Sequence, residues 1–326
     1  MDKLMEIKNL KKFFPIASSG FFQNPQYVKA VDDVSFDIYK GETLGIVGES
    51  GCGKSTMGRL LVNLLDSTSG EILFEGKDIN EIRKKNRKDI SKNIQIIFQD
   101  PYASLNPRMK IGDIIKEPMK VNNIANGQEL EKRVNELLEY VGLAPYHKDR
   151  YPHEFSGGQR QRVGIARAIS VNPKLIVCDE AVSALDVSIQ AQILNLLSDL
   201  QHKLGFTYLF IAHGLNVVKH ISNRVGVMYL GKLVEIGDVN SLYSTPLHPY
   251  TKALLSAIPI PNPEIKKERI ILSGDVPSPI NPPNGCRFHT RCPKCMNICK
   301  ECEPKFIELD NVHKVACHLY DENNKN

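Results

Sequence analysis

The stretch Gly48-Glu49-Ser50-Gly51-Cys52-Gly53-Lys54-Ser55-Thr56 decides the fold of this chain. It follows an apolar run at 43–47 and precedes a leucine-rich segment, so a buried strand, a glycine turn and a helix at 56–65 are predicted in that order. The glycines let backbone N–H groups turn inward around phosphate oxygens, and the N-terminus of the helix adds positive potential. We therefore expect Lys54 to reach the β- and γ-phosphates of a bound nucleotide and Ser55 to bind Mg²⁺.

A second glycine-rich segment, Phe155-Ser156-Gly157-Gly158-Gln159, opens a predicted helix that ends at Ile169. One nucleotide-binding domain needs only one such anion cradle. The second cradle is therefore expected to serve a nucleotide that is held by another copy of the fold. Together the two segments predict a pair of domains that close around ATP.

Length, charge and hydropathy exclude several classes of protein. The chain has 326 residues, more than one average domain, and 42% of them are hydrophobic, enough for a proper core. Its 42 Lys and Arg against 37 Asp and Glu give a net charge of only +5, without the basic stripe that nucleic-acid binding needs. No uninterrupted apolar run is long enough to span a membrane, and the N-terminus lacks the apolar core of a signal peptide. We expect a cytosolic protein whose cysteines are metal ligands or buried thiols rather than disulfides.

Polar residues stand at the ends of three apolar segments predicted to be strands. Asp179 and Glu180 end the segment that begins at Lys174; Asp179 is expected to hold the hydration shell of Mg²⁺, and Glu180 to polarise an attacking water. Gln99 could contact Mg²⁺ and this water, and His213 could contact the γ-phosphate. Taken alone, a surface glutamine and a satisfied core histidine are the alternative interpretations.

The order of these motifs resembles that of the ATPase subunit of ATP-binding cassette (ABC) transporters, over about residues 1–255. The resemblance implies an α/β P-loop NTPase core with a β-rich N-terminal edge and a helical subdomain. It also implies that the Ser156 segment faces the γ-phosphate of a partner's ATP. The segment that begins at Ser183 and ends at Asp186 would lie at the interface of the dimer.

The resemblance implies an aromatic contact with adenine. Phe13 is the residue expected to stack on the base, with Phe14 and Tyr27 as alternatives.

Three positions depart from the family's usual pattern. Phe155 replaces a leucine, Ala181 replaces the proline that commonly follows the catalytic glutamate, and Gly214 replaces an aspartate after the histidine. None of the three removes a reacting group.

The composition changes after about residue 256. Prolines recur between Pro259 and Asn284, which predicts an extended linker at 257–285. We therefore predict a nucleotide-binding domain at 1–256 with a helical insert at about 100–160, then the linker, then a separate cysteine-rich unit at 286–326. Most of the cysteines lie in that unit: Cys286, Cys292, Cys295, Cys299, Cys302 and Cys317.

Three further stretches carry a finer resemblance: Asp100–Arg108, Leu247–Thr251, and the cysteine-rich tail. They resemble the oligopeptide/dipeptide importer branch, specifically the second of its two ATPase subunits. The resemblance implies ATP hydrolysis that drives peptide uptake from the cytoplasmic face of the membrane. The implied partners are a related ATPase subunit, two membrane permeases that dock on the helical insert and on Gln99–Arg108, and, indirectly, an extracellular binding protein, with no nucleic acid.

Four cysteines fit the tail pattern of that branch: Cys286, Cys292, Cys299 and Cys317. Four thiolates in a reducing compartment suit a [4Fe–4S] cluster or a structural Zn²⁺, and the resemblance favours the cluster. The extra thiols of Cys295 and Cys302 leave a zinc site open as an alternative, and a tail without metal is the third interpretation.

Two other functions remain open. One is a soluble ABC ATPase acting in translation or DNA repair, although such proteins usually carry two cassettes or a long coiled-coil insert, and this chain has neither. The other is an import ATPase of the same branch that serves nickel or another small solute.

Overall fold

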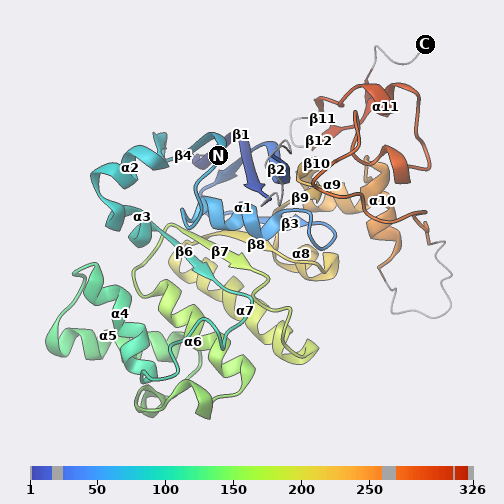
Figure 1. Ribbon diagram of the computed structural model, residues 1–326. Coiled ribbons are helices and arrows are strands. Elements are labelled where there is room, and N and C mark those ends of the chain that lie inside the picture. Colours follow the sequence, from blue (N-terminus) through green and yellow to red (C-terminus); the bar gives the residue numbers. More distant parts are fainter. Residues whose placement is uncertain (1, 17–24, 259–268, 311–312, 322–326) are drawn as a thin grey trace.

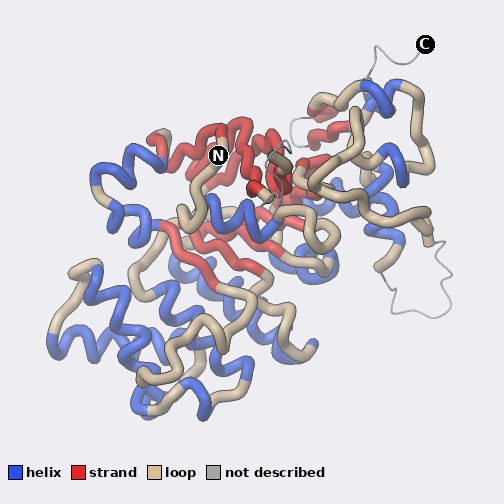
Figure 2. The backbone as a smooth tube through the Cα atoms, in the orientation of Figure 1, coloured by secondary structure: helices blue, strands red, loops and turns tan. Residues whose placement is uncertain are grey.

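The computed structural model describes residues 2–16, 25–258, 269–310 and 313–321. Helices surround two β-sheets in this part of the chain, and Figure 2 shows the strands gathered between the helical regions. No helix among the described residues is both long and apolar enough to cross a bilayer. The first prolines of the predicted linker, at 259–263, and the last residues of the cysteine unit, at 322–326, lie outside the described ranges.

The larger sheet has eight strands, and its centre is parallel. In spatial order they are β11 (Phe306–Asp310), β12 (His313–Ala316), β10 (Lys232–Asp238), β9 (Arg224–Tyr229), β3 (Thr43–Val47), β8 (Thr207–Ile211), β7 (Leu175–Asp179) and β6 (Ile94–Ile97). The strands from β9 to β6 run parallel, whereas β10, β12 and β11 pair antiparallel. Because carboxyl ends of parallel strands meet at one edge, the loops after β3, β6, β7 and β8 lie side by side.

The central strands β3, β7 and β8 are mostly apolar and are buried along their whole length, because both faces of the sheet are covered. Tyr208 and Phe210 of β8 enter one hydrophobic cluster, the first core, while Leu209 and Ile211 enter another, the second core. Strand β7 alternates in the same way, since successive side chains point to opposite faces.

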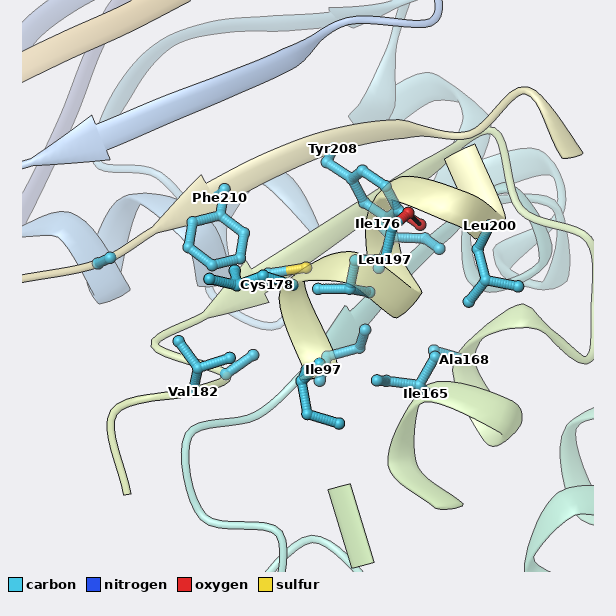
Figure 3. Close-up of a cluster of buried hydrophobic side chains, with 14 of the residues drawn as sticks. Ile97, Ile165, Ala168, Ile176, Cys178, Val182, Leu197, Leu200, Tyr208 and Phe210 are labelled. Carbon is cyan, nitrogen blue, oxygen red and sulfur yellow. Dashed lines mark hydrogen bonds between the residues drawn. The ribbon is translucent and has the colours of Figure 1, made fainter. Parts of the chain in front are cut away.

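Helices α6 (Gly157–Ile169) and α7 (Val187–Leu204) cover the first core. In Figure 3 the side chain of Leu197, from α7, lies close to Ile176 of the sheet, and Ile165 and Ala168, from α6, belong to the same cluster. Helix α7 ends where Gly205 takes a φ of 73°, a left-handed conformation that glycine adopts without strain.

Helix α1 (Lys54–Leu61) covers the second core together with the smaller, antiparallel sheet. That sheet contains β2 (Tyr27–Tyr39), β1 (Lys3–Pro15), β4 (Ser69–Phe74) and β5 (Lys77–Asp78), in that spatial order. The helix ends four residues before the predicted Leu65. Asn63 takes a φ of 57°, which a right-handed helix does not accommodate.

The region around 100–160 is mainly helical, and α6 extends it to Ile169. It contains α4 (Ile111–Val121), α5 (Gly127–Tyr140) and two short 3₁₀ turns, and Figure 1 shows α4, α5 and α6 as one group beyond the β6 edge. The remaining helices are α2 (Ile79–Lys85), α3 (Arg87–Asn93), α8 (Leu215–Ile221), α9 (Val239–Ser244), α10 (Pro249–Ser256) and α11 (Ile298–Glu301).

The cysteine-rich tail shares the sheet and the core of the preceding domain, although the sequence predicts a separate unit. Strand β12 pairs with β10, and the carboxylate of Glu235 on β10 lies 2.8 Å from the ring of His313 on β12. The ring of Phe288 is buried in the first core, 5.3 Å from that of Tyr250. A segment of this size cannot bury a core of its own, so it uses that of its neighbour.

Candidate nucleotide-binding site

The glycine loop follows β3 directly and turns because its three glycines adopt conformations that other residues avoid; Gly51 has a φ of 77°. Gly48 has a φ of 153° and Gly53 a φ of 101°. A Cβ atom on Gly53 would lie 2.0 Å from the backbone oxygen of Ala30, far inside van der Waals contact. The loop is therefore confined between β2 on one side and the start of α1 on the other.

The side chain of Lys54 folds back over the loop. Its ammonium group donates hydrogen bonds to the backbone oxygens of Gly48, at 2.8 Å, and Glu49, at 3.0 Å, and the residue is 3% exposed. It also approaches the sulfur of Cys52, a thiol whose pKa burial raises above its ordinary value. No carboxylate among the described residues forms an ion pair with this buried ammonium, so the loop favours an anion at this point.

Two residues that the motif analysis did not select hold Glu49 from outside the loop. The backbone N–H of Glu49 donates to the phenol oxygen of Tyr250 at 2.8 Å, and its carboxylate forms an ion pair with Arg291 at 2.8 Å. Tyr250 is fully buried, and this burial raises the pKa of its hydroxyl well above its usual range. Tyr250 belongs to the Leu247–Thr251 stretch, which contributed to the family resemblance, but the sequence did not indicate what Tyr250 itself contacts.

Two acids stand at the carboxyl end of β7: Asp179 is its last residue and Glu180 follows it. Asp179 is 3% exposed, and its Oδ1 has no hydrogen-bond partner among the described residues, while Oδ2 lies 3.9 Å from Nε of Arg59. An orphaned buried carboxylate oxygen costs free energy, so a cation or ordered water is expected there. Together with the hydroxyl of Ser55 at the start of α1, this donor set fits Mg²⁺, a cation that prefers oxygen ligands.

Glu180 and His213 come together across adjacent strand ends. Oε1 of Glu180 lies 2.5 Å from Nε2 of His213, and the glutamate is 6% exposed whereas the histidine side chain is 42% exposed. Glu180 has a φ of 51°, and its N–H donates to the oxygen of Ile211. Such a strained conformation persists only where the surroundings fix it, which is common at functional sites.

The other predicted site residues lie at different distances from the phosphate loop and the strand ends. Gln99 follows β6 at the same edge and is exposed. Phe13 pairs with Lys29 on β2, next to the Ala30 oxygen that packs on Gly53, so its strand borders the loop. Tyr27 is 41% exposed at the far end of the same strand pair.

The second glycine segment lies apart from the first. Ser156 caps α6: its hydroxyl accepts from the N–H of Gln159 at 3.3 Å, and the Gln159 side chain accepts from the N–H of Ser156 at 3.0 Å. Both residues are exposed or half-buried, as is Asp186 at the start of α7. Helix α6 lies in the first core and α1 in the second, on opposite faces of the sheet.

The four predicted cluster ligands gather beside the sheet. The N–H of Cys286 donates to the oxygen of Cys299 at 2.8 Å, and Cys299 and Cys317 are buried. Burial raises the pKa of Cys317 to about 11, and the thiols of Cys292 and Cys299 act in the same direction. Among the described residues, however, no group of three or more His, Cys, Asp or Glu is arranged closely enough to hold a metal ion.

Comparisons with known proteins agree with the fold. The structure resembles the ATP-binding cassette MJ0796 in a post-hydrolysis state bound to ADP and Pi, with a TM-score of 0.63 and 28% identity over 72% of this chain and 98% of the other. It also resembles cbiO1 from Clostridium perfringens, with a TM-score of 0.64 and 28% identity over 75% and 92% of the two chains. The class of protein is thus an ABC-type ATPase.

The sequence comparisons are more specific. The family model of ABC transporters matches residues 31–183, and that of the oligopeptide/dipeptide transporter C-terminal region matches 234–299. The oligopeptide transport ATP-binding protein AppF of Bacillus subtilis is 57% identical over 98% of both chains. OppF of Haemophilus influenzae is 54% identical over 96% of both. The chain belongs to the family of oligopeptide transport ATP-binding proteins of ABC transporters.

The loop geometry predicts how two glycines respond to substitution. Gly53→Ala should lower the free energy of unfolding of the nucleotide-free protein clearly more than Gly51→Ala. Both residues have positive φ, but a Cβ on Gly53 collides with Ala30, whereas one on Gly51 meets open space. We expect the Gly51 variant to lose about 1 kcal/mol from backbone strain alone and the Gly53 variant several times as much. Urea unfolding measures both, and equal losses would contradict the described loop.

Proposed function

We propose that this chain hydrolyses ATP to power oligopeptide or dipeptide uptake, as an ATPase subunit of an ABC importer at the cytoplasmic face of the membrane. The observation that carries the proposal is that Lys54, Asp179 and Glu180 lie at the same edge of the larger sheet, beyond β3 and at the end of β7, with only β8 between these two strands. The likeness to oligopeptide transport ATP-binding proteins over nearly the whole chain supports the choice of peptide as cargo.

Each residue of the site has a task in this reaction. Lys54 exchanges its two carbonyl partners for the β- and γ-phosphates, which are stronger acceptors because they are charged. Ser55, Asp179 and Gln99 would hold Mg²⁺, which would supply positive charge to neutralise the charge that develops on the phosphates. Glu180 orients the attacking water. His213 already contacts Glu180, which supports assigning it the contact that links this glutamate to the γ-phosphate.

The adenine and the γ-phosphate need contacts from elsewhere. We assign adenine stacking to Phe13, on the strand that borders the loop. Ser156–Gln159 form the N-terminus of α6, which is suited to binding an anion. Helix α6 packs in the first core, whereas α1 packs in the second. The segment serves the nucleotide of a second ATPase subunit in a head-to-tail pair, with Asp186 at the seam.

The remaining partners follow from the same role. Two membrane permeases would dock on the helical region and on residues 99–108, fed by an extracellular binding protein. A nickel or other small-solute importer is the second candidate, because cargo is selected by proteins other than this chain. Uptake assays with peptide and with nickel in the assembled transporter separate the two.

We also propose that Cys286, Cys292, Cys299 and Cys317 bind a [4Fe–4S] cluster, with Zn²⁺ as the alternative. The burial of Cys299 and Cys317 and the hydrogen bond between Cys286 and Cys299 support it. The thiols would have to approach one another further than they do here. The role of the cluster would be structural or redox-sensing, since the nucleotide site contains none of these four cysteines.

Substitution of Glu180 tests the assignment of the ATPase site. Glu180→Gln should bind Mg-ATP with nearly unchanged affinity but lose at least a hundredfold in turnover, because the amide cannot polarise the water. Lys54→Ala should lose ATP binding itself. Nucleotide titration and phosphate release in the assembled transporter measure the two effects. Loss of binding in the Glu180 variant, or normal turnover, would contradict the assignment.

Metal content tests the cysteine proposal. Anaerobically purified protein should contain about four iron and about four acid-labile sulfide per chain. Cys299→Ser should lose both, while Cys302→Ser, which changes an exposed thiol outside the proposed set, should keep them. One zinc per chain without iron would overturn the cluster and favour the alternative, and absence of both metals would overturn both.

A further inference from the structure

Glu49 is one of the residues through which the phosphate loop contacts the rest of the protein. Its backbone oxygen accepts a hydrogen bond from Lys54, its backbone N–H donates to Tyr250, and its carboxylate pairs with Arg291. All three polar groups of this one residue are therefore occupied. Only the first of these contacts lies within the loop; the other two come from segments more than 200 residues later in the chain.

Arg291 lies in the cysteine-rich tail, next to Cys292. Its side chain is 9% exposed and that of Glu49 is 27% exposed, so the ion pair is sheltered from water more than a surface pair. The same stretch of the tail supports Tyr250, because the ring of Phe288 packs 5.3 Å from the ring of Tyr250. One short segment thus holds Glu49 both directly and through Tyr250.

A second set of contacts reaches the loop at Cys52. Arg287 pairs with the buried carboxylate of Asp32 and donates to the backbone oxygen of Leu230. The following residue, Gly231, donates its N–H to the oxygen of Cys52 at 3.0 Å and accepts from the N–H of Asp32. Arg287 therefore fixes the turn that supports the far side of the loop.

We propose that Arg291 is a positioning residue for ATP binding: its ion pair with Glu49 holds the phosphate loop from the C-terminal tail. Arg291 acts through Glu49, whose backbone oxygen receives the phosphate-binding Lys54. The inference rests on the proposed function of the loop. It gives the tail a task at the nucleotide site whatever metal the cysteines bind.

The physical reason lies in the cost of ordering the loop. If Arg291 is removed, Glu49 can rotate away and the N–H and carbonyl groups on either side of it lose their fixed orientation. ATP binding must then also restore that order, which lowers affinity. The unpaired carboxylate would in addition repel the triphosphate.

The test compares ATP affinity in Arg291→Ala with that in Lys232→Ala. Lys232, on β10, also connects the nucleotide-binding domain to the tail, through an ion pair with Glu303 at 2.5 Å. Neither residue of this pair belongs to the phosphate loop. In the full chain, Mg-ATP titration should show Kd raised about tenfold for Arg291→Ala and less than twofold for Lys232→Ala. Arg291→Lys should bind ATP more tightly than Arg291→Ala but less tightly than the wild type, because lysine keeps the positive charge but lacks the paired N–H donors of the guanidinium group.

A double-mutant cycle separates positioning from general destabilisation. Glu49→Ala combined with Arg291→Ala should bind ATP no more weakly than the weaker single variant, since both remove the same contact. Urea unfolding should show similar losses of stability for Arg291→Ala and Lys232→Ala. Additive effects in the cycle, or wild-type affinity in Arg291→Ala, would overturn this inference alone. Failure of the wild type to bind Mg-ATP would overturn the proposed function and this inference with it.

Discussion

The carboxyl edge of the parallel strands is the constraint on which the rest of the site depends. Because β3, β8, β7 and β6 are neighbours in one sheet and point the same way, the residues after them meet although they are far apart in the chain. The glycine loop, His213, Glu180 and Gln99 lie at this edge for that reason. Because both faces of the sheet are covered, Asp179 is buried. Its Oδ1 has no hydrogen-bond partner among the described residues, so it favours a ligand there.

The tail of the chain is part of this arrangement. Strand β12 extends the larger sheet through β10, and Phe288 fills space in the first core. The tail therefore needs no core of its own, and its arginines are brought to the loop. A protein whose phosphate loop is held in this way couples the order of its C-terminal residues to its affinity for nucleotide.

The phosphate loop and the central strands could be predicted from the sequence, because local patterns of glycines and apolar residues determine them. The loop is set by its glycines, and the predicted strand segments at 43–47, 174–180 and 207–213 contain the buried strands β3, β7 and β8. The Arg291–Glu49 pair could not be predicted, since it joins residues far apart and neither stands in a periodic pattern. The same holds for Tyr250, whose role at the loop depends on how α10 packs.

The central claim is that the two glycine segments serve different nucleotides. Within one chain the Ser156 cap stands at the exposed start of a helix that packs in the first core, whereas the Lys54 loop leads into a helix that packs in the second. We therefore propose that the cap serves a nucleotide held by a partner. The most direct measurement is an experimental structure of the assembled transporter with Mg-ATP, in a variant that does not hydrolyse it. The account predicts the Ser156 hydroxyl within hydrogen-bond distance of the γ-phosphate bound to the partner subunit. A Ser156 that contacts its own chain's nucleotide, or only solvent, would contradict it.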